Sequence, residues 1–235
     1  MHIPDGLLAP ITYLPAYAVA IPLWAWAVRR VAGGLDEALI PRLAVLTAAA
    51  FVLSLIMIPL PGGTSGHLIG VPLLAILFGW WAAFLAYSLV LLLQTVLLGS
   101  GGLTALPVNA LAMGAVGAAV SLSLWRLLGG AARLRAWREQ GGRGAPVAAF
   151  PVIAATVAGI VAAAAILALV LGLQPLLATD ADGAPRFFPF PVSVALPALV
   201  APHLVIGLGE GILTWVVLRQ LAWHDAGSGD GGGAR

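Results

Sequence analysis

The most constraining feature of this 235-residue sequence is a stretch from Leu43 to Trp125 that contains no Asp, Glu, Lys or Arg. A water-soluble domain carries charged side chains on its surface, so a stretch of this length is typical of a chain embedded in lipid. The whole composition agrees, because 61% of the residues are hydrophobic, 9% are charged and the mean hydropathy is +1.05. We therefore expect an all-α, polytopic membrane protein.

Prolines and glycines divide the apolar sequence into seven predicted transmembrane helices. One helix over residues 68–98 would be about 46 Å long, against an apolar membrane core of about 30 Å. We therefore expect it to break near Gly79, where two tryptophans suit a membrane interface. The third span is then short, and we expect it to start below the membrane surface, behind a glycine loop that is buried in protein. The predicted spans are residues 7–28, 43–60, 66–80, 81–98, 107–128, 145–173 and 202–221.

The arginines indicate the orientation of these spans. With seven spans and the N-terminus outside, only Arg186 of the eleven arginines falls outside, whereas six spans would move the arginines of residues 126–143 outside, against the positive-inside rule. We therefore expect an N-terminus outside, a cytoplasmic C-terminus and an external connection over residues 173–192. Residues 1–223 are predicted to form one transmembrane domain, followed by a disordered cytoplasmic tail over residues 224–235.

The first six residues, MHIPDG, predict a metal clamp. The α-amine of Met1, the backbone nitrogen of His2 and the nearer ring nitrogen of His2 can close two chelate rings around one ion. Those three nitrogens lie in one plane, and a fourth would complete the square that is diagnostic of Ni(II) or Cu(II) with nitrogen ligands. Pro4 then prevents a regular helix or strand, and Asp5-Gly6 is typical of a turn.

His67 is the predicted fourth ligand. It follows residues 61–66, PGGTSG, whose small side chains let the backbone approach a ligand closely. In the predicted topology, His67 lies on the same outer face as the Met1-His2 clamp.

Two further ionisable residues occur in the last predicted span. His203 and Glu210 share one face of that helix but lie about 10 Å apart, too far for one ion to contact both. An ionisable group inside a span suggests function. The alternative is that Glu210 is neutral or hydrogen-bonded and positions helices. We expect neither residue to bind the captured metal directly.

Several functional classes are excluded by composition and motifs. The chain has no cysteine, which excludes disulfides, thiolate metal sites and iron–sulfur clusters. Its pI near 9.7 reflects arginines that lie mostly between apolar runs, so we expect no nucleic-acid partner. It contains no paired carboxylates, nucleophile–base pairing or cofactor loop, and we therefore expect no enzyme activity.

Several segments besides the N-terminus carry a family resemblance. Together with MHIPDG, they resemble the CbiM/NikM family, the substrate-capture membrane components of energy-coupling-factor (ECF) transporters for cobalt and nickel. The resemblance runs from residue 1 to about residue 221. The segments are residues 66–70 (GHLIG), residues 101–106 (GGLTAL), Asn109, residues 113–114 (MG) and residues 202–211 (PHLVIGLGEG).

The resemblance implies a fold, a metal site and partners. It implies a bundle of seven helices whose N-terminus folds inward, with the metal held by the Met1 amine, the backbone and ring nitrogens of His2 and the His67 ring. The implied partners are a transmembrane coupling subunit, two ATP-binding cassette ATPases and a small membrane subunit of the N type, in the plasma membrane of a prokaryote. The sequence has no Walker P-loop pattern, consistent with ATP hydrolysis in another chain. We expect no cofactor besides the transported Ni(II) or Co(II).

Other residues are candidates for orienting the ligands. Asn109 and the loop of residues 99–102, with Gly101 and Gly102, are predicted to position His67 or the clamp. Asp5 is predicted to balance charge or to cap the turn.

Two other functions remain open at this point. One is a proton-coupled metal permease that acts alone through His203 and Glu210 and needs no ATP. The other is a membrane enzyme or assembly scaffold with an incidental Met-His start. The spacing does not decide between nickel and cobalt: a square of nitrogens favours low-spin Ni(II), and Cu(II) binds such sites at least as tightly.

An N-terminal extension tests the predicted clamp, because one residue ahead of Met1 converts the α-amine into an amide. We expect a tagged chain to remain folded and to lose nickel binding and uptake. Helical circular dichroism checks the fold, and metal titration checks the binding. Full nickel binding by the tagged chain would rule out the clamp.

Overall fold

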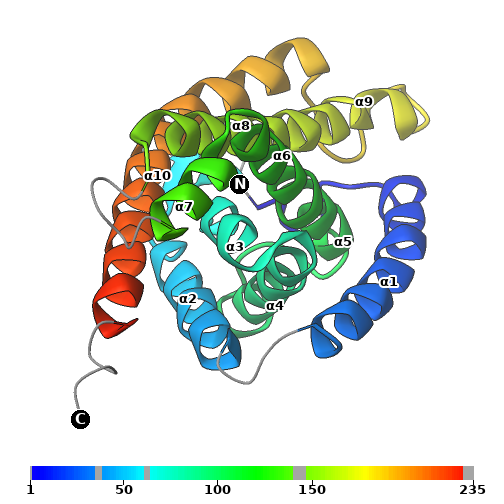
Figure 1. Ribbon diagram of the computed structural model, residues 1–235. Coiled ribbons are helices and arrows are strands. Elements are labelled where there is room, and N and C mark those ends of the chain that lie inside the picture. Colours follow the sequence, from blue (N-terminus) through cyan, green and yellow to red (C-terminus); the bar gives the residue numbers. More distant parts are fainter. Residues whose placement is uncertain (1, 35–38, 61–63, 140–146, 230–235) are drawn as a thin grey trace.

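The computed structural model describes residues 2–34, 39–60, 64–139 and 147–229, which form a helical bundle (Figure 1). Apolar runs form helices in lipid because a helix satisfies its backbone N–H and C=O groups internally. The elements are α1 (Pro10–Ala32), α2 (Leu39–Leu53), β1 (Ile58–Leu60), β2 (Thr64–Gly66), α3 (Val71–Phe78), α4 (Trp80–Leu98), α5 (Leu106–Asn109), the π-helix η1 (Ala110–Gly117), α6 (Ala118–Leu127), α7 (Gly130–Glu139), α8 (Ala149–Gly172), α9 (Gln174–Leu177) and α10 (Val192–Gly229).

Five helical segments of the described chain are long and apolar enough to cross a membrane, so the chain is a multi-pass membrane protein. Each overlaps one of the predicted spans. The segments are Pro10–Ala32, Trp80–Leu98, Leu106–Leu127, Ala149–Leu177 and Val192–Ala222. The other two predicted spans correspond to shorter helices, since α2 has 15 residues and α3 has 8.

The break predicted near Gly79 is confirmed. Helix α3 ends at Phe78 and α4 begins at Trp80, and Gly79 between them has φ of +83°, which L side chains rarely adopt. With eight residues, α3 is about 12 Å long. It lies at the centre of the bundle in Figure 1, surrounded by longer helices.

The predicted span over residues 43–60 is wrong at its C-terminal end. Helix α2 ends at Leu53, and β1 pairs with β2 in an antiparallel hairpin in which Ile58 lies opposite Gly66. A helix continuing through Pro59 would lose a backbone hydrogen bond there, whereas a short strand tolerates proline. The hairpin ends directly before His67 and so determines where that residue enters the bundle.

Helix α10 begins at Val192, ten residues before the predicted start at Pro202. Both Pro197 and Pro202 lie inside it, which is tolerated in transmembrane helices because neighbouring groups satisfy the freed backbone. The helix continues past His224 to Gly229, and residues 230–235 lie outside the described residues.

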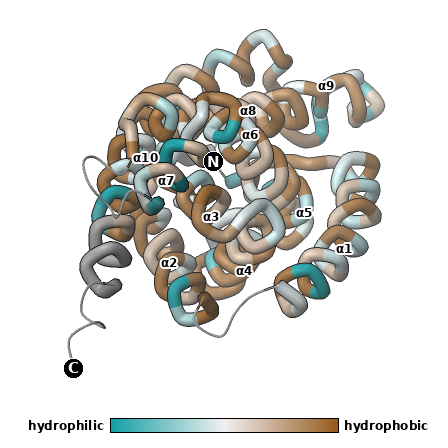
Figure 2. The backbone as a smooth tube through the Cα atoms, in the orientation of Figure 1, coloured by the Kyte–Doolittle hydropathy of each residue, from teal (hydrophilic) through white to brown (hydrophobic). Residues whose placement is uncertain are grey.

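Glycines allow α10 to pack closely against α8. A Cβ added to Gly207 would lie 3.2 Å from Val157 Cα, and one added to Gly211 would lie 3.0 Å from Ile153 Cα. Close backbone contact through small residues is a common way for helices to associate in lipid. Figure 2 shows hydrophobic residues along most of the helices and hydrophilic ones in short stretches.

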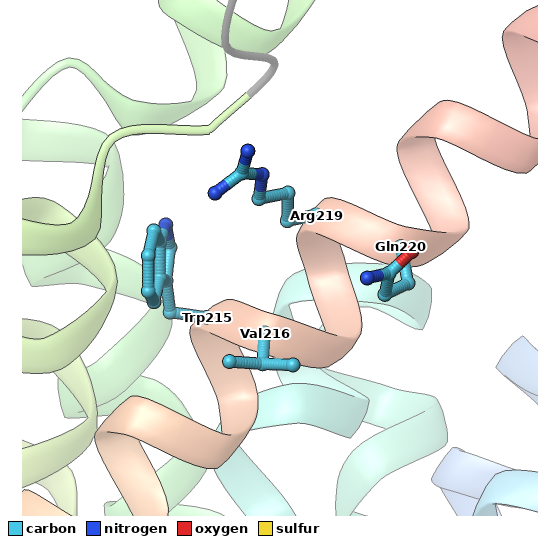
Figure 3. A pocket seen from close by; sticks show the side chains of 4 residues that line it. All are labelled: Trp215, Val216, Arg219 and Gln220. Carbon is cyan, nitrogen blue, oxygen red and sulfur yellow. The ribbon is translucent and has the colours of Figure 1, made fainter.

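A surface pocket of about 370 Å³ lies beside the C-terminal half of α10, lined by Trp215, Val216, Arg219 and Gln220 (Figure 3). The Trp215 indole donates a hydrogen bond to the Val147 carbonyl (3.0 Å), and the Arg219 guanidinium lies 5.8 Å from the Trp215 ring. The hydrogen bond joins α10 to the segment before α8, and the Arg219–Trp215 contact lies within α10. The pocket is roughly three helical turns, about 18 Å, from His203.

Candidate metal centre

The segment before α1 runs from that helix into the middle of the bundle (Figure 1). The side-chain amide of Asn109 holds it there through two hydrogen bonds to Ile3. The Ile3 N–H donates to Asn109 Oδ1 (3.1 Å), and Asn109 Nδ2 donates to the Ile3 carbonyl (3.1 Å). The amide thus pairs with both polar groups of one peptide unit in a buried position, where either group left unpaired would be costly.

Asp5 ties the N-terminal segment to the loop that precedes α5. Its carboxylate accepts the N–H of Leu103 (3.1 Å), the N–H of Thr104 (2.8 Å) and the Thr104 hydroxyl. Burial alone would raise the pKa of Asp5, but these hydrogen bonds outweigh that effect and lower the pKa below its usual value. The carboxylate is therefore ionised at neutral pH and caps the turn before α5.

The glycine loop makes room for this arrangement. A Cβ on Gly102 would overlap the backbone and carboxylate of Asp5. Gly101 has φ of +87°, and a Cβ there would lie 3.6 Å from His2 Cβ. Gly102 thus lets the N-terminal segment lie against the loop, whereas Gly101 supplies a backbone conformation that L side chains rarely adopt.

The segment brings His2 against His67. The ring centroids lie 4.4 Å apart with an interplanar angle of 32°, and the residues are only 3% and 2% exposed. Met1 lies outside the described residues. Burial lowers the pKa of His2 to about 3, so its ring is neutral, which is the form that binds metals.

His67 is held in one tautomer. Its Nδ1 lies 2.9 Å from the Leu68 carbonyl, which can only accept a hydrogen bond, so the proton is on Nδ1. Its Nε2 consequently carries a lone pair, is buried and has no hydrogen-bond partner. A metal-binding histidine typically has this arrangement, with one ring nitrogen donating to a fixed acceptor and the other free.

Gln94 of α4 is a residue of this site that the sequence analysis missed. Its Nε2 donates to Ser54 Oγ (2.5 Å), and Ser54 donates to the Phe51 carbonyl (2.7 Å), which orients the Gln94 amide. The Gln94 side chain interacts with His2. Gln94 Oε1 and His2 Nε2 are both buried and lack hydrogen-bond partners. Gln94 Oε1 is an acceptor and His2 Nε2 is a potential donor, so a small shift of either side chain would form a hydrogen bond between them.

Ser100 contacts the other nitrogen of the His2 ring, with Oγ 3.1 Å from Nδ1. If Nε2–H is directed at Gln94, Nδ1 carries the lone pair and accepts the Ser100 hydroxyl. That tautomer leaves the nearer ring nitrogen of His2 available to a metal that displaces Ser100. Nothing in the sequence marked Gln94, which sits within an uninterrupted apolar run, and Ser100 is one of several small residues in its loop.

Glu210 of α10 anchors the segment that follows His67. Its carboxylate accepts the N–H of Ile69 (2.7 Å) and of Gly70 (2.8 Å) at the start of α3. Gly70 has φ of +71°. A carboxylate at a helix N-terminus satisfies orphan backbone donors and interacts favourably with the helix dipole. Glu210 therefore ties α10 to the histidine loop.

His203 is also completely buried, but it is not part of one close cluster with the other two. Its Nδ1 lies 2.6 Å from the Leu199 carbonyl, and its Nε2 has no hydrogen-bond partner. Among the described residues, no group of three or more His, Cys, Asp or Glu side chains is placed to hold one metal ion together. Side chains alone thus do not complete a site, which is consistent with a contribution from backbone and terminal nitrogens.

Comparison with known proteins decides the family. Residues 2–225 match the CbiM family, described as the cobalt uptake substrate-specific transmembrane region. The chain belongs to the CbiM family. It is 38% identical over 219 residues to the fused nickel transport protein NikMN of Rhodobacter capsulatus, covering 91% of this chain and 59% of that relative. Over 130 residues, 54% of this chain and 51% of the relative, it is 38% identical to the cobalt transport protein CbiM of a Roseiflexus species.

A solved structure shares the fold. The crystal structure of a truncated transition metal transporter superposes with a TM-score of 0.84 at 35% identity, covering 95% of this chain and 99% of that one. The two relatives named above are nickel and cobalt transport proteins, and this chain spans 59% and 51% of their respective lengths.

Replacing Gln94 with Met tests its role beside His2, because Met has a similar length but no acceptor for the ring N–H. We expect the nickel affinity of the purified chain to fall roughly 10- to 100-fold, the usual effect of removing a group that orients a metal ligand. Nitrogen NMR of labelled histidine should show a changed His2 tautomer. Thr156→Val, a buried polar substitution on α8, is the control that leaves both unchanged. An unaltered affinity and tautomer in Gln94→Met would contradict this role.

Replacing Glu210 with Gln tests the anchor between α10 and the His67 segment. Gln offers one acceptor oxygen where the carboxylate offers two, and its NH₂ group opposes the second backbone N–H. We expect nickel affinity to fall by roughly tenfold or more, while circular dichroism shows an intact helical fold. Thr214→Val, one turn further along α10, should bind as the unmodified chain does. Equal affinities of the two variants would show that the anchor does not position His67.

Proposed function

We propose that this chain is the substrate-binding membrane component of an ECF importer, which captures Ni(II) or Co(II) from outside and passes it inward. The observation that carries the proposal is the pair of buried imidazoles, His2 and His67, whose ring centroids lie 4.4 Å apart and of which His67 keeps its lone-pair nitrogen, Nε2, without a hydrogen-bond partner. An unpaired buried polar group costs about 1–3 kcal/mol. A site that keeps such groups in an apolar bundle is suited to a ligand that binds them.

Four nitrogens make up the proposed ligand set. They are the Met1 α-amine, the His2 backbone nitrogen, the His2 Nδ1 and the His67 Nε2. Binding at Nδ1 replaces the contact with Ser100, and the His2 Nε2–H then requires an acceptor, for which Gln94 Oε1 is available. A square of four nitrogens favours low-spin Ni(II), and it does not suit Na⁺, Mg²⁺ or Ca²⁺, which prefer oxygen ligands.

The proposed topology has seven membrane segments, with the N-terminus outside and the C-terminus in the cytoplasm of a prokaryotic cell. In this arrangement the short helix α3 lies inside the bundle and α2 lies at its edge, beside the five long helices. Energy would come from partner chains: a coupling subunit, two ATPases and a small N-type membrane subunit. The relative from Rhodobacter capsulatus is described as a fused NikMN protein, which supports the presence of further subunits.

The experiment that tests this function is an anaerobic titration of the purified, untagged chain with Ni(II), Co(II) and Cu(II), followed by the visible spectrum. We expect one ion per chain, with the yellow absorption of square-planar Ni(II) and no paramagnetism. His67→Ala removes the fourth nitrogen, so it should weaken binding and abolish that spectrum, whereas Thr156→Val should retain it. An octahedral nickel spectrum, or binding that survives His67→Ala unchanged, would refute the proposed site.

A further inference from the structure

His203 presents an unused nitrogen in the interior of the protein. The residue is 0% exposed, and its Nε2 has no hydrogen-bond partner. The Leu199 carbonyl, 2.6 Å from Nδ1, can only accept a hydrogen bond, so the proton is on Nδ1 and the lone pair on Nε2. His67 has the same arrangement with the Leu68 carbonyl. A neutral imidazole with a fixed tautomer and a free Nε2 is the common metal-binding form of histidine.

The face of α10 that carries His203 lies along the His67 segment. Glu210 binds the backbone of Ile69 and Gly70. One turn earlier, Ile206 packs against the hairpin, since a Cβ on Gly66 would lie 2.6 Å from Ile206 Cδ1. His203 is three residues before Ile206 and therefore lies on the same face, one turn further. This order along α10, with Glu210 at Ile69 and Ile206 at Gly66, places His203 beside the segment that carries His67.

This placement is close to the His2–His67 pair without belonging to it. No three described His, Cys, Asp or Glu side chains are arranged to hold one ion at the same time. A nitrogen just outside a planar site has a recognised chemical use. Square-planar ions with eight d electrons exchange ligands by accepting a fifth ligand from above the plane before one of the original four leaves.

We propose that His203 is an exchange ligand, which binds the transition-metal ion transiently through Nε2 as the ion enters or leaves the site formed by His2 and His67. This inference rests on the proposed function. In release, the Nε2 lone pair forms a bond to the metal while one of the four capture bonds breaks. Loading is the reverse, in which a capture nitrogen forms its bond to the metal and replaces Nε2. No proton is transferred, because Nε2 is unprotonated and Nδ1–H remains on the Leu199 carbonyl.

An exchange ligand changes the rates at which the metal binds and leaves, and does not change the dissociation constant. It lowers the barrier in both directions, so its removal slows loading and release by the same factor and leaves the dissociation constant unaltered. A permanent ligand or a structural residue behaves differently, since its loss weakens binding itself. This difference makes the proposal testable on the purified chain without partner subunits.

The test compares the untagged chain with His203→Asn, in which the shorter amide can still donate to the Leu199 carbonyl but has no nitrogen at the position of Nε2. Stopped-flow absorbance with Ni(II) gives the loading rate, and excess EDTA gives the release rate. We expect both rates to fall tenfold or more, with a dissociation constant within about threefold of the original. Thr214→Val, another buried polar residue of α10, is the matched control and should leave both rates unchanged.

Each other outcome has a distinct meaning. Unchanged rates in His203→Asn would overturn the exchange role and leave the proposed function intact. A large loss of affinity with an unchanged loading rate would make His203 a permanent ligand or a structural residue, which also overturns the proposal. Failure of the unmodified chain to bind Ni(II) would overturn the proposed function itself.

Discussion

The metal centre depends on one constraint, the confinement of an extended chain end inside a helical bundle. Asn109 confines the chain end by pairing with both backbone polar groups of Ile3. Asp5 accepts three further hydrogen bonds from the loop that precedes α5. Neither contact involves the imidazoles. The position of His2 is therefore determined by contacts of the residues that follow it in the chain, which is how a site achieves preorganisation.

The buried polar groups of this region follow one pattern. The side chains that hold the scaffold are paired: Asn109 with Ile3, Glu210 with Ile69 and Gly70. By contrast, each of the three buried imidazoles keeps Nε2 without a hydrogen-bond partner. A packed apolar interior penalises unpaired groups. The contrast separates a supporting framework, whose polar groups are paired, from the three histidines, each of which keeps an unpaired ring nitrogen.

Much of this arrangement could be predicted from local signals. The Met-His start, the glycine-framed His67 and the break at Gly79 depend on residue types whose chemistry is visible along the chain. The hairpin before His67 was missed because the short apolar run of β1 resembles the end of a helix. Gln94 was missed for a different reason: its hydrogen bond to Ser54 and its approach to His2 join residues far apart in sequence, and no pattern along α4 distinguishes it.

Glu210 shows how a contact in space bears on alternatives that sequence leaves open. A stand-alone permease needs a carboxylate that exchanges protons along the transport route. Both oxygens of Glu210 instead accept backbone N–H groups at the start of α3, and the residue is only 2% exposed. Protonating it would convert one acceptor into a donor facing a backbone N–H, and would loosen the segment that carries His67. The carboxylate therefore favours a role in holding the ligand loop to α10, and a displacement of α10 would move the loop with it.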